Sequence, residues 1–189
     1  MMLLSPWVRA IALILSWLAW VLAFVVRRSR NHEKATQIDR KARWGIVLQM
    51  AGYFIASTHG PKIWISDLEI WRAIAGMFFA LLAIALAWSA VATLGRQWRV
   101  DAGLNEDHEL VRDGAYRLVR HPIYASMLGM LLAVIFLVGT LPGWPVAIVL
   151  FVTGLEVRVH VEDGLLRARF GDRFTTWQRS VPAYLPLVR

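Results

Sequence analysis

The stretch PIYASMLGMLLAVIFLVGTLPGWPVAIVLFVTGL, from Pro122 to Leu155, holds 34 residues without one charged side chain and decides the fold. A single helix of that length would measure ~50 Å at about 1.5 Å per residue, whereas the hydrocarbon core of a bilayer is about 30 Å thick. The segment GTLPGWP, residues 139–145, carries glycines and prolines that interrupt helices. The stretch therefore predicts two membrane-spanning helices joined as a hairpin by a tight turn.

Three further apolar segments precede this hairpin. Ala10–Val26, Trp44–Pro61 and Ala73–Gly95 each lack Asp, Glu, Lys and Arg. The first is followed by RRSR, residues 27–30, which is typical of a stop-transfer flank rather than of a signal-peptide cleavage site. We therefore expect an all-α integral membrane protein with about five transmembrane helices, including the hairpin.

The overall composition agrees with a membrane protein. Of the 189 residues, 58% are hydrophobic, and the mean hydropathy of +0.50 is too apolar for an ordinary soluble domain. The length fits one membrane domain, residues 1–189, in which residues 1–95 supply the N-terminal spans and residues 96–189 hold the candidate chemistry. There is no cysteine, which excludes disulfides and thiolate metal sites. The sequence also lacks ligand-spaced histidine pairs and Gly-rich nucleotide motifs, so we predict no metal site and no Rossmann-type site.

The basic residues predict how the chain is oriented in the membrane. The formal net charge is +8, but the basic side chains flank apolar segments, which favours a membrane role over nucleic-acid binding. Segments 27–43, 96–121 and 158–189 carry seven, five and six Lys and Arg residues, which is 18 of the 21 in the chain. The positive-inside rule places these segments and the C-terminus in the cytoplasm and the N-terminus outside.

The C-terminal region shows a helical stripe of apolar residues. They recur at spacings of three and four: Val161, Leu165, Leu166, Phe170, Phe174 and Trp177. This pattern predicts a C-terminal amphipathic helix that lies on the membrane or across the domain.

A first cluster of chemically competent residues precedes the hairpin. Pro122 is tolerated in the first turn of a helix, so we expect a helix to begin there with Arg120 and His121 at its N-terminal end. Such an end attracts anions, for instance the carboxylate of a ligand. In the alternative interpretation, Arg117, Arg120 and His121 are interfacial anchors that contact lipid phosphates.

A second cluster follows the hairpin. Arg158 and Glu162 are four residues apart and share a helix face, and Glu162 and Asp163 are adjacent carboxylates. The simple alternative for Arg158 and Glu162 is a surface ion pair worth ~0.3–0.5 kcal/mol. Glu156 lies closer to the apolar run, where a carboxylate needs a partner, and we expect it to pair with an arginine.

Taken in order, three segments resemble the isoprenylcysteine carboxyl methyltransferase family. They are LGRQW (94–98), HELVRDGAYRLVRHPIYASMLGMLLA (108–133) and, after the hairpin, RVHVEDGLLRARFGDRFTTWQRSVPAYLPLV (158–188). The resemblance covers about half of the chain, and the N-terminal half matches only in being membrane-spanning. It implies an integral-membrane methyltransferase that uses S-adenosylmethionine and releases S-adenosylhomocysteine. The implied acceptor is the carboxylate of a lipid-like, isoprenylcysteine-type molecule.

The resemblance also implies roles for individual residues. In the implied cofactor site, His108, Glu109, Leu110 and Val111 contribute mainly backbone groups, and Tyr116, His121, Pro122, Tyr124 and Glu162 contribute further contacts. Arg120, at the same helix end, joins this cofactor-binding set. Arg158 and Glu162 form the implied catalytic pair, with Arg158 on the acceptor side. The sequence departs from the family pattern in Gly114-Ala115-Tyr116, where Gly-Pro-Tyr is usual, and in Glu162-Asp163, where a glutamate pair is common.

Other functions remain compatible with the sequence. One is a methyltransferase acting on a phospholipid or another small molecule, and an amine acceptor would then require a general base, with Glu162 or His121 as candidates. Another is a membrane reductase using NADPH, and a third is a non-catalytic membrane protein whose basic cluster binds lipid headgroups. Membrane lipids and a lipophilic acceptor are the expected partners, nucleic acid is not, and the sequence leaves the oligomeric state open.

Overall fold

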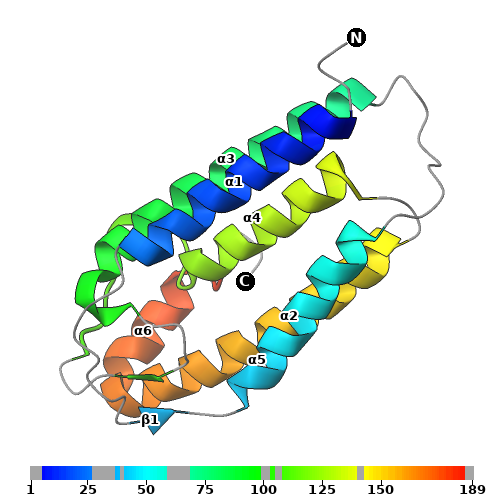
Figure 1. The fold of residues 1–189 in the computed structure, drawn as a ribbon. Helices are drawn as coiled ribbons and strands as arrows, with labels where there is room; N and C mark the ends of the chain where they lie inside the picture. Colours follow the sequence, from blue (N-terminus) through cyan, green and yellow to red (C-terminus); the bar gives the residue numbers. More distant parts are fainter. Residues whose placement is uncertain are drawn as a thin grey trace.

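The computed structural model describes residues 6–26, 37–38, 41–58, 69–98, 103–104, 108–139 and 143–185. Five long helices run through them: α1 (Pro6–Val26), α2 (Ala42–Ser57), α3 (Glu69–Leu94), α4 (Pro122–Leu137) and α5 (Gly143–Phe170). The shorter elements are η3 (Gly95–Gln97), η4 (Gly114–Arg117), α6 (Asp172–Ser180) and the two-residue strands β1 (Gln37–Ile38) and β2 (Gly103–Leu104). The prediction of an all-α membrane fold is confirmed (Figure 1).

The apolar segments of the sequence become the long helices. Within the described residues, α1, α3 from Ile70 onward and α5 are long and apolar enough to cross a membrane, and α4 is a shorter apolar helix. The predicted break in the 34-residue run is also found, because α4 ends at Leu137 and α5 begins at Gly143. Residues 59–61, at the end of the second predicted span, lie outside the described residues.

The five helices pack in two groups. In the first group, α1 and α4 both pack against α3. In the second group, α5 packs against α2 (Figure 1). The two helices of the predicted hairpin, α4 and α5, therefore each pack mainly against another helix and only slightly against each other. Small residues allow the close packing of α2 on α5, because a Cβ atom on Gly154 would lie 2.5 Å from the carbonyl oxygen of Gly45.

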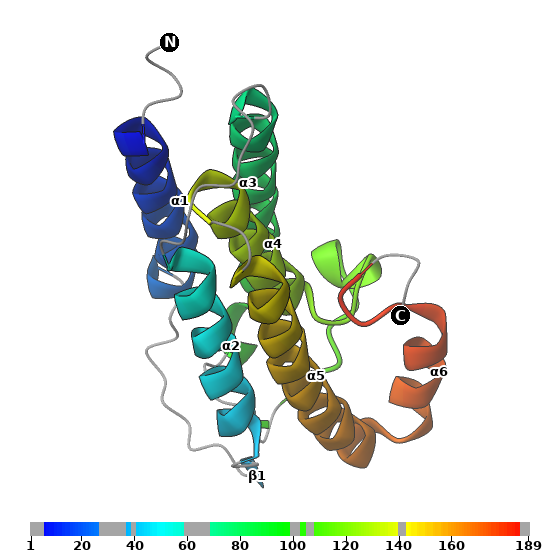
Figure 2. The ribbon, with the colours of Figure 1, turned by 90° about the vertical axis from the view of Figure 1, so that its right-hand side faces the viewer.

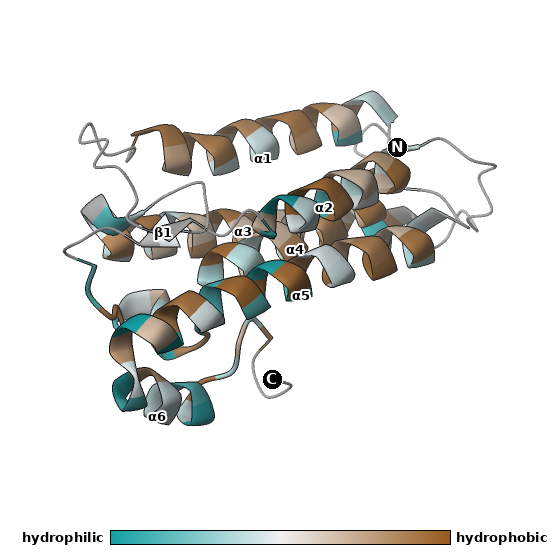
Figure 3. Ribbon diagram, turned by 90° about the horizontal axis from the view of Figure 1, so that it is seen from below, coloured by the Kyte–Doolittle hydropathy of each residue, from teal (hydrophilic) through white to brown (hydrophobic). Residues whose placement is uncertain are grey.

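Most residues of α1 are hydrophobic (Figure 3), and both α1 and α3 expose large apolar side chains. Large hydrophobic side chains such as Leu18 and Phe78 are 62% and 59% exposed. A soluble monomer rarely exposes contiguous apolar surface on this scale, but such surface is suited to contact with lipid tails. The chain is thus a multi-pass integral membrane protein.

The C-terminal stripe of apolar residues is divided between two helices. Gly171 adopts a φ of +53°, a conformation that glycine tolerates best, and it separates the end of α5 from α6. α6 turns away from the line of α5 (Figure 2). Phe174 and Trp177 of α6 are buried against Tyr116 and Ala90. The amphipathic helix was predicted to lie either on the membrane or across the domain, and these contacts show that α6 packs across the domain.

The segments predicted to carry the chemistry meet at one end of the bundle. β1 pairs with β2 in antiparallel fashion, with Gln37 opposite Leu104, so the connection after α1 contacts the connection after α3. The C-terminal end of α3, the N-terminal end of α4 and the C-terminal end of α5 lie at this same end (Figure 1). The side of the membrane that this end faces stays a prediction.

The opposite end of α4 is held by a buried arginine. Nη2 of Arg72, on α3, donates hydrogen bonds to the carbonyl oxygens of Gly139 at 2.8 Å and Ile135 at 3.4 Å. These carbonyls lie in the last turn of α4 and just beyond it, where a cation is favoured, and the Ile135 carbonyl also accepts a hydrogen bond from the N–H of Gly139. The contact fixes α4 against α3 and so helps to set the position of its N-terminal end.

Candidate active site

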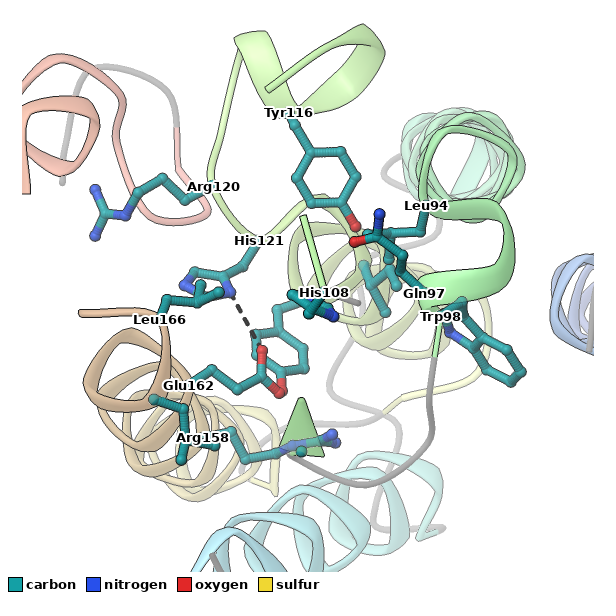
Figure 4. A pocket seen from close by; sticks show the side chains of 14 residues that line it. Leu94, Gln97, Trp98, His108, Tyr116, Arg120, His121, Arg158, Glu162 and Leu166 are labelled. Carbon is teal, nitrogen blue, oxygen red and sulfur yellow. Dashed lines mark hydrogen bonds and ion pairs between the residues drawn. The ribbon is translucent and has the colours of Figure 1, made fainter. Parts of the chain in front are cut away.

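A cavity lies between the end of α3, the start of α4 and the C-terminal part of α5 (Figure 4). Aromatic side chains of Trp98, Tyr116 and Tyr124 form part of its wall, and Arg158 and Glu162 contribute opposite charges. Arg158 and Glu162 reach the cavity from successive turns of α5, as their spacing of four residues predicts. They therefore face this cavity, and the alternative of a solvated surface ion pair does not describe them.

The structure brings most of the predicted site residues together. Those that line the cavity are His108, Tyr116, Arg120, His121, Tyr124, Arg158 and Glu162. The other four do not line it: Glu109, Leu110, Val111 and Pro122. Leu110 and Val111 pack against the Tyr116–Trp177 cluster, Pro122 occupies the first turn of α4, and the exposed Glu109 donates its backbone N–H to Oε1 of Gln97 at 3.2 Å.

His121 is held between two carboxylates of α5. Its Nδ1 lies 3.4 Å from Oε2 of Glu162, and its Nε2 lies 2.9 Å from Oδ1 of Asp163. The imidazole also stacks on the ring of Tyr124, with 5.5 Å between the ring centroids. Both ring nitrogens are therefore engaged, and the side chain has one defined orientation. Figure 4 shows the contact with Glu162.

The two carboxylates favour the charged form of this histidine. Burial lowers the pKa of His121, but hydrogen bonds to Asp163 and Glu162 and the charges of these groups outweigh it, so that the pKa is raised above its ordinary value. In its charged form the imidazole joins the guanidinium groups of Arg120 and Arg158 among the side chains that line the cavity.

The raised pKa of His121 predicts how stability depends on pH. The pairing stabilises the folded state fully below the unfolded pKa of about 6.5 and is lost as the pH rises through the higher folded pKa. We expect His121→Asn to lower the melting temperature in detergent most near pH 6, with a difference from wild type that shrinks as the pH is raised. His160→Asn, at an exposed position of the same helix as the two carboxylates, is the control. A His121→Asn difference that stays constant with pH would contradict the ion pairing.

Arg120 faces the C-terminal segment rather than the centre of the cavity. Its Nη2 lies 3.0 Å from Oδ2 of Asp163, and its Nη1 donates to the carbonyl oxygens of Gln178 and Val181. The backbone N–H groups of Arg120 and His121 donate to the carbonyls of Pro182 and Ala183 at 2.8 and 2.7 Å. The anion that Arg120 meets is therefore the Asp163 carboxylate of its own chain.

Tyr124 connects the charged groups of the cavity. Its hydroxyl donates a hydrogen bond to Oε1 of Glu162, and the guanidinium carbon of Arg158 lies 4.7 Å from the centre of its ring. A cation over an aromatic face is attracted by the ring quadrupole. On the opposite wall, burial and then the charge of Glu162 raise the pKa of Tyr116, so its hydroxyl stays protonated. The site thus combines a carboxylate, a guanidinium and neutral phenols.

Sequence reasoning overlooked contacts that only the fold creates. The sequence marks Asp163 only as a neighbour of Glu162, yet Asp163 is 6% exposed and contacts Arg120, His121 and Gln178 together. Glu156, expected to pair with an arginine, accepts a hydrogen bond from the Tyr184 hydroxyl. The only available signal for Asp163 was its position beside Glu162 near the end of an apolar run.

Comparison with known proteins shows which family the sequence matches. The sequence profile of the isoprenylcysteine carboxyl methyltransferase family matches residues 75–168. A protein-S-isoprenylcysteine O-methyltransferase from Schizosaccharomyces pombe is 30% identical over 112 residues, which cover 58% of this chain and 48% of that protein. The B form from Arabidopsis thaliana is 27% identical over 126 residues, 62% and 61% of the two chains. The enzyme from Tribolium castaneum is 26% identical over 167 residues, 84% and 54% of the two chains.

The present chain thus spans about half to three fifths of the length of these relatives. The family profile covers the end of the bundle that holds the cavity, from within α3 to near the end of α5. The cavity residues that it spans include His108, Tyr116, His121, Arg158 and Glu162. On the profile match and the three relatives together, the chain belongs to the isoprenylcysteine carboxyl methyltransferase family.

Proposed function

We propose that this protein transfers a methyl group from S-adenosylmethionine to the carboxylate of a lipid-like acceptor of the isoprenylcysteine type. The observation that supports this most strongly is the convergence of Arg158, Glu162 and Tyr124, from two helices, on one cavity at the end of an apolar bundle. The names of the three relatives point to the same reaction. The cavity lies at one end of the apolar helices, a position at which a lipophilic acceptor and a water-soluble cofactor can meet.

The residues present fit the cofactor. S-adenosylmethionine carries a cationic sulfonium, an ammonium group and a flat adenine. Glu162 offers a carboxylate whose side chain is 28% exposed, and the rings of Trp98 and Tyr116 offer aromatic surface to a planar base or a cation. His121 and Tyr124 fix the orientation of the Glu162 carboxylate. In this proposal Glu162, Tyr116, His121 and Tyr124 hold the cofactor, and His108 adds to the wall of its pocket.

The acceptor carboxylate needs orientation rather than deprotonation, because it is already ionised at neutral pH. Arg158 binds it through charge-assisted hydrogen bonds, and the surrounding apolar residues remove water from it. When bound, the cofactor would supply an electrophilic methyl group, and Arg158 would hold the carboxylate oxygen that accepts it. Holding the two reactants in line is the main task left to the protein.

The geometry favours a carboxylate over an amine as the acceptor. An amine acceptor needs a base, and His121 was the histidine considered for that role. Both nitrogens of its ring are paired with carboxylates, and these carboxylates raise its pKa, which favours the protonated form that cannot act as a base. Glu162, the other candidate, already accepts a hydrogen bond from Tyr124 and pairs with His121. These contacts suit both residues to binding and orientation rather than to proton abstraction.

The proposal is tested by a methyl-transfer assay with purified protein in detergent. S-adenosylmethionine labelled in its methyl group is offered with N-acetyl-S-farnesylcysteine, phosphatidylethanolamine or a long-chain fatty acid. We expect label in the farnesylcysteine product as a methyl ester, which mild base hydrolyses to labelled methanol. Base-stable label in phosphatidylethanolamine would favour the phospholipid alternative. Calorimetric titration that shows binding of NADPH and none of S-adenosylhomocysteine would favour a reductase, and binding of neither would favour a non-catalytic role.

The proposed orientation places the cavity end of the bundle in the cytoplasm, as the positive-inside rule predicts. The basic segments 27–43, 96–121 and 158–189 all adjoin helix ends on that side. The cofactor is a soluble metabolite, and this orientation gives it direct access to the cavity.

A further inference from the structure

A buried glutamine of α2 contacts the proposed acceptor-binding arginine. Gln49 is 0% exposed, and its Oε1 accepts a hydrogen bond from Nη1 of Arg158 at 3.4 Å. Within the part of the chain that the structure describes, Nε2 of Gln49 makes no hydrogen bond. An unsatisfied buried amide destabilises the fold, and polar residues inside apolar spans tend to serve function. Packing alone therefore gives no reason for a glutamine at this position.

The same face of α2 is shaped to receive the arginine. Gly45 is four residues before Gln49, so the two lie on one side of the helix. A Cβ atom at Gly45 would lie 2.5 Å from Cγ of Arg158, which means that the arginine stem runs directly against the α2 backbone. The absence of a side chain at Gly45 thus makes room for the stem, and the amide of Gln49 meets the guanidinium.

Arg158 is consequently held from two other helices. The ring of Tyr124, from α4, faces its guanidinium at 4.7 Å, and Gln49, from α2, accepts a hydrogen bond from its Nη1. Gln49 and Tyr124 are both neutral groups. A neutral partner orients a guanidinium and adds no negative charge that would compete with a bound anion. A glutamate at position 49 would hold the arginine more tightly but would compete with that anion.

We propose that Gln49 is a positioning residue that holds Arg158 in the orientation needed to bind an anionic acceptor, and so helps to restrict the acceptor to carboxylates. This inference rests on the proposed function, in which Arg158 binds the acceptor carboxylate. It assigns a role in the site to α2, which lies outside residues 75–168, the part of the chain that the family profile matches.

The test compares Gln49→Met, which keeps the volume but removes the hydrogen-bond acceptor, with Gln49→Glu. Initial rates are measured with N-acetyl-S-farnesylcysteine, and the uncharged carboxamide of the same molecule is used as a competitive inhibitor. We expect Gln49→Met to raise KM for the carboxylate about tenfold, with kcat and the inhibition constant of the carboxamide changed by less than about twofold. We expect Gln49→Glu to raise KM for the carboxylate further, because its carboxylate competes for Arg158. Met50→Leu, at a neighbouring exposed position of α2, serves as the matched control.

The affinity for S-adenosylhomocysteine, measured by calorimetry, shows whether each variant has kept its fold. Gln49→Glu and Gln49→Asn retain a polar group and so provide the comparison if Gln49→Met loses the fold. Equal weakening of the carboxylate and the carboxamide would mean a purely structural role and would overturn the inference, as would an unchanged KM for the carboxylate in Gln49→Met. If the wild-type protein itself transfers no methyl group to the carboxylate, the proposed function fails, and this outcome is distinct from a failure of the inference alone.

Discussion

Replacement of Arg158 by methionine is expected to lower kcat/KM for the carboxylate acceptor by about 10² to 10⁴-fold. A guanidinium binds a carboxylate through two parallel charge-assisted hydrogen bonds, each worth roughly 1.5–3 kcal/mol when both groups are shielded from water. The side chain of Arg158 is buried at the cavity wall, with 8% of the residue exposed, so solvent screens this interaction only weakly. Steady-state rates with N-acetyl-S-farnesylcysteine provide the measurement.

The lysine variant sharpens the result. Lysine keeps the positive charge but lacks the planar fork that matches a carboxylate and stacks on the ring of Tyr124, so we expect Arg158→Lys to recover only part of the loss. Arg169→Met, at an exposed position farther along α5, is the control for a general effect of lost charge. Binding of S-adenosylhomocysteine should survive in all three variants. A kcat/KM close to wild type in Arg158→Met would remove this arginine from acceptor binding.

Replacement of Glu162 by glutamine is expected to lower kcat/KM for S-adenosylmethionine by about 10²-fold or more. The amide keeps the shape of the side chain and an oxygen that can accept from Tyr124, but it loses the negative charge that attracts a cationic cofactor. Loss of one hydrogen bond between charged groups costs about 1.5–3 kcal/mol, and the orientation of His121, which pairs with Glu162, is disturbed as well.

The cofactor and its product separate the two contributions to this loss. S-adenosylmethionine carries the sulfonium charge, and S-adenosylhomocysteine does not. If Glu162 acts through its charge, Glu162→Gln should weaken binding of the cofactor more than binding of the product in calorimetric titrations. Asp172→Asn, which removes an exposed carboxylate at the start of α6, is the control and should bind both ligands as the wild type does. Wild-type turnover in Glu162→Gln would exclude the carboxylate from the mechanism.

Much of the helical framework could be predicted because membrane insertion depends on local composition. The uncharged run of 34 residues after His121 exceeds one membrane thickness, and its glycines and prolines mark the break between α4 and α5. Pro122 marks the start of α4 for an equally local reason, since proline has no N–H to donate. The break within the predicted amphipathic helix was harder to predict. The apolar stripe continues on both sides of Gly171, although α5 ends just before this residue and α6 begins just after it.

Part of the candidate site could also be predicted from the residues in order along the chain. Tyr116, His121, Tyr124, Arg158 and Glu162 were identified by their resemblance to a family pattern, and all five line the cavity. Their proximity could be predicted for two local reasons. Arg158 and Glu162 lie one helical turn apart on α5, and His121 and Tyr124 lie on either side of Pro122, which marks the start of α4. The roles of these residues stay predictions until the variants are measured.

Only the tertiary structure decided how side chains from distant segments meet. Gln49 and Arg158 are 109 positions apart, and a glutamine without charge gives no sign in an apolar segment that it will face an arginine. In the same way, the sequence contained Asp163 and Arg120 but not their pairing, which depends on how α5 is rotated and how the C-terminal segment returns beside α4. Local composition determines which segments enter the membrane, because each segment partitions largely by itself. The partners of a side chain depend on the relative rotation and spacing of packed helices, and small residues such as Gly45 and Gly154 fix these through contacts that no single segment contains.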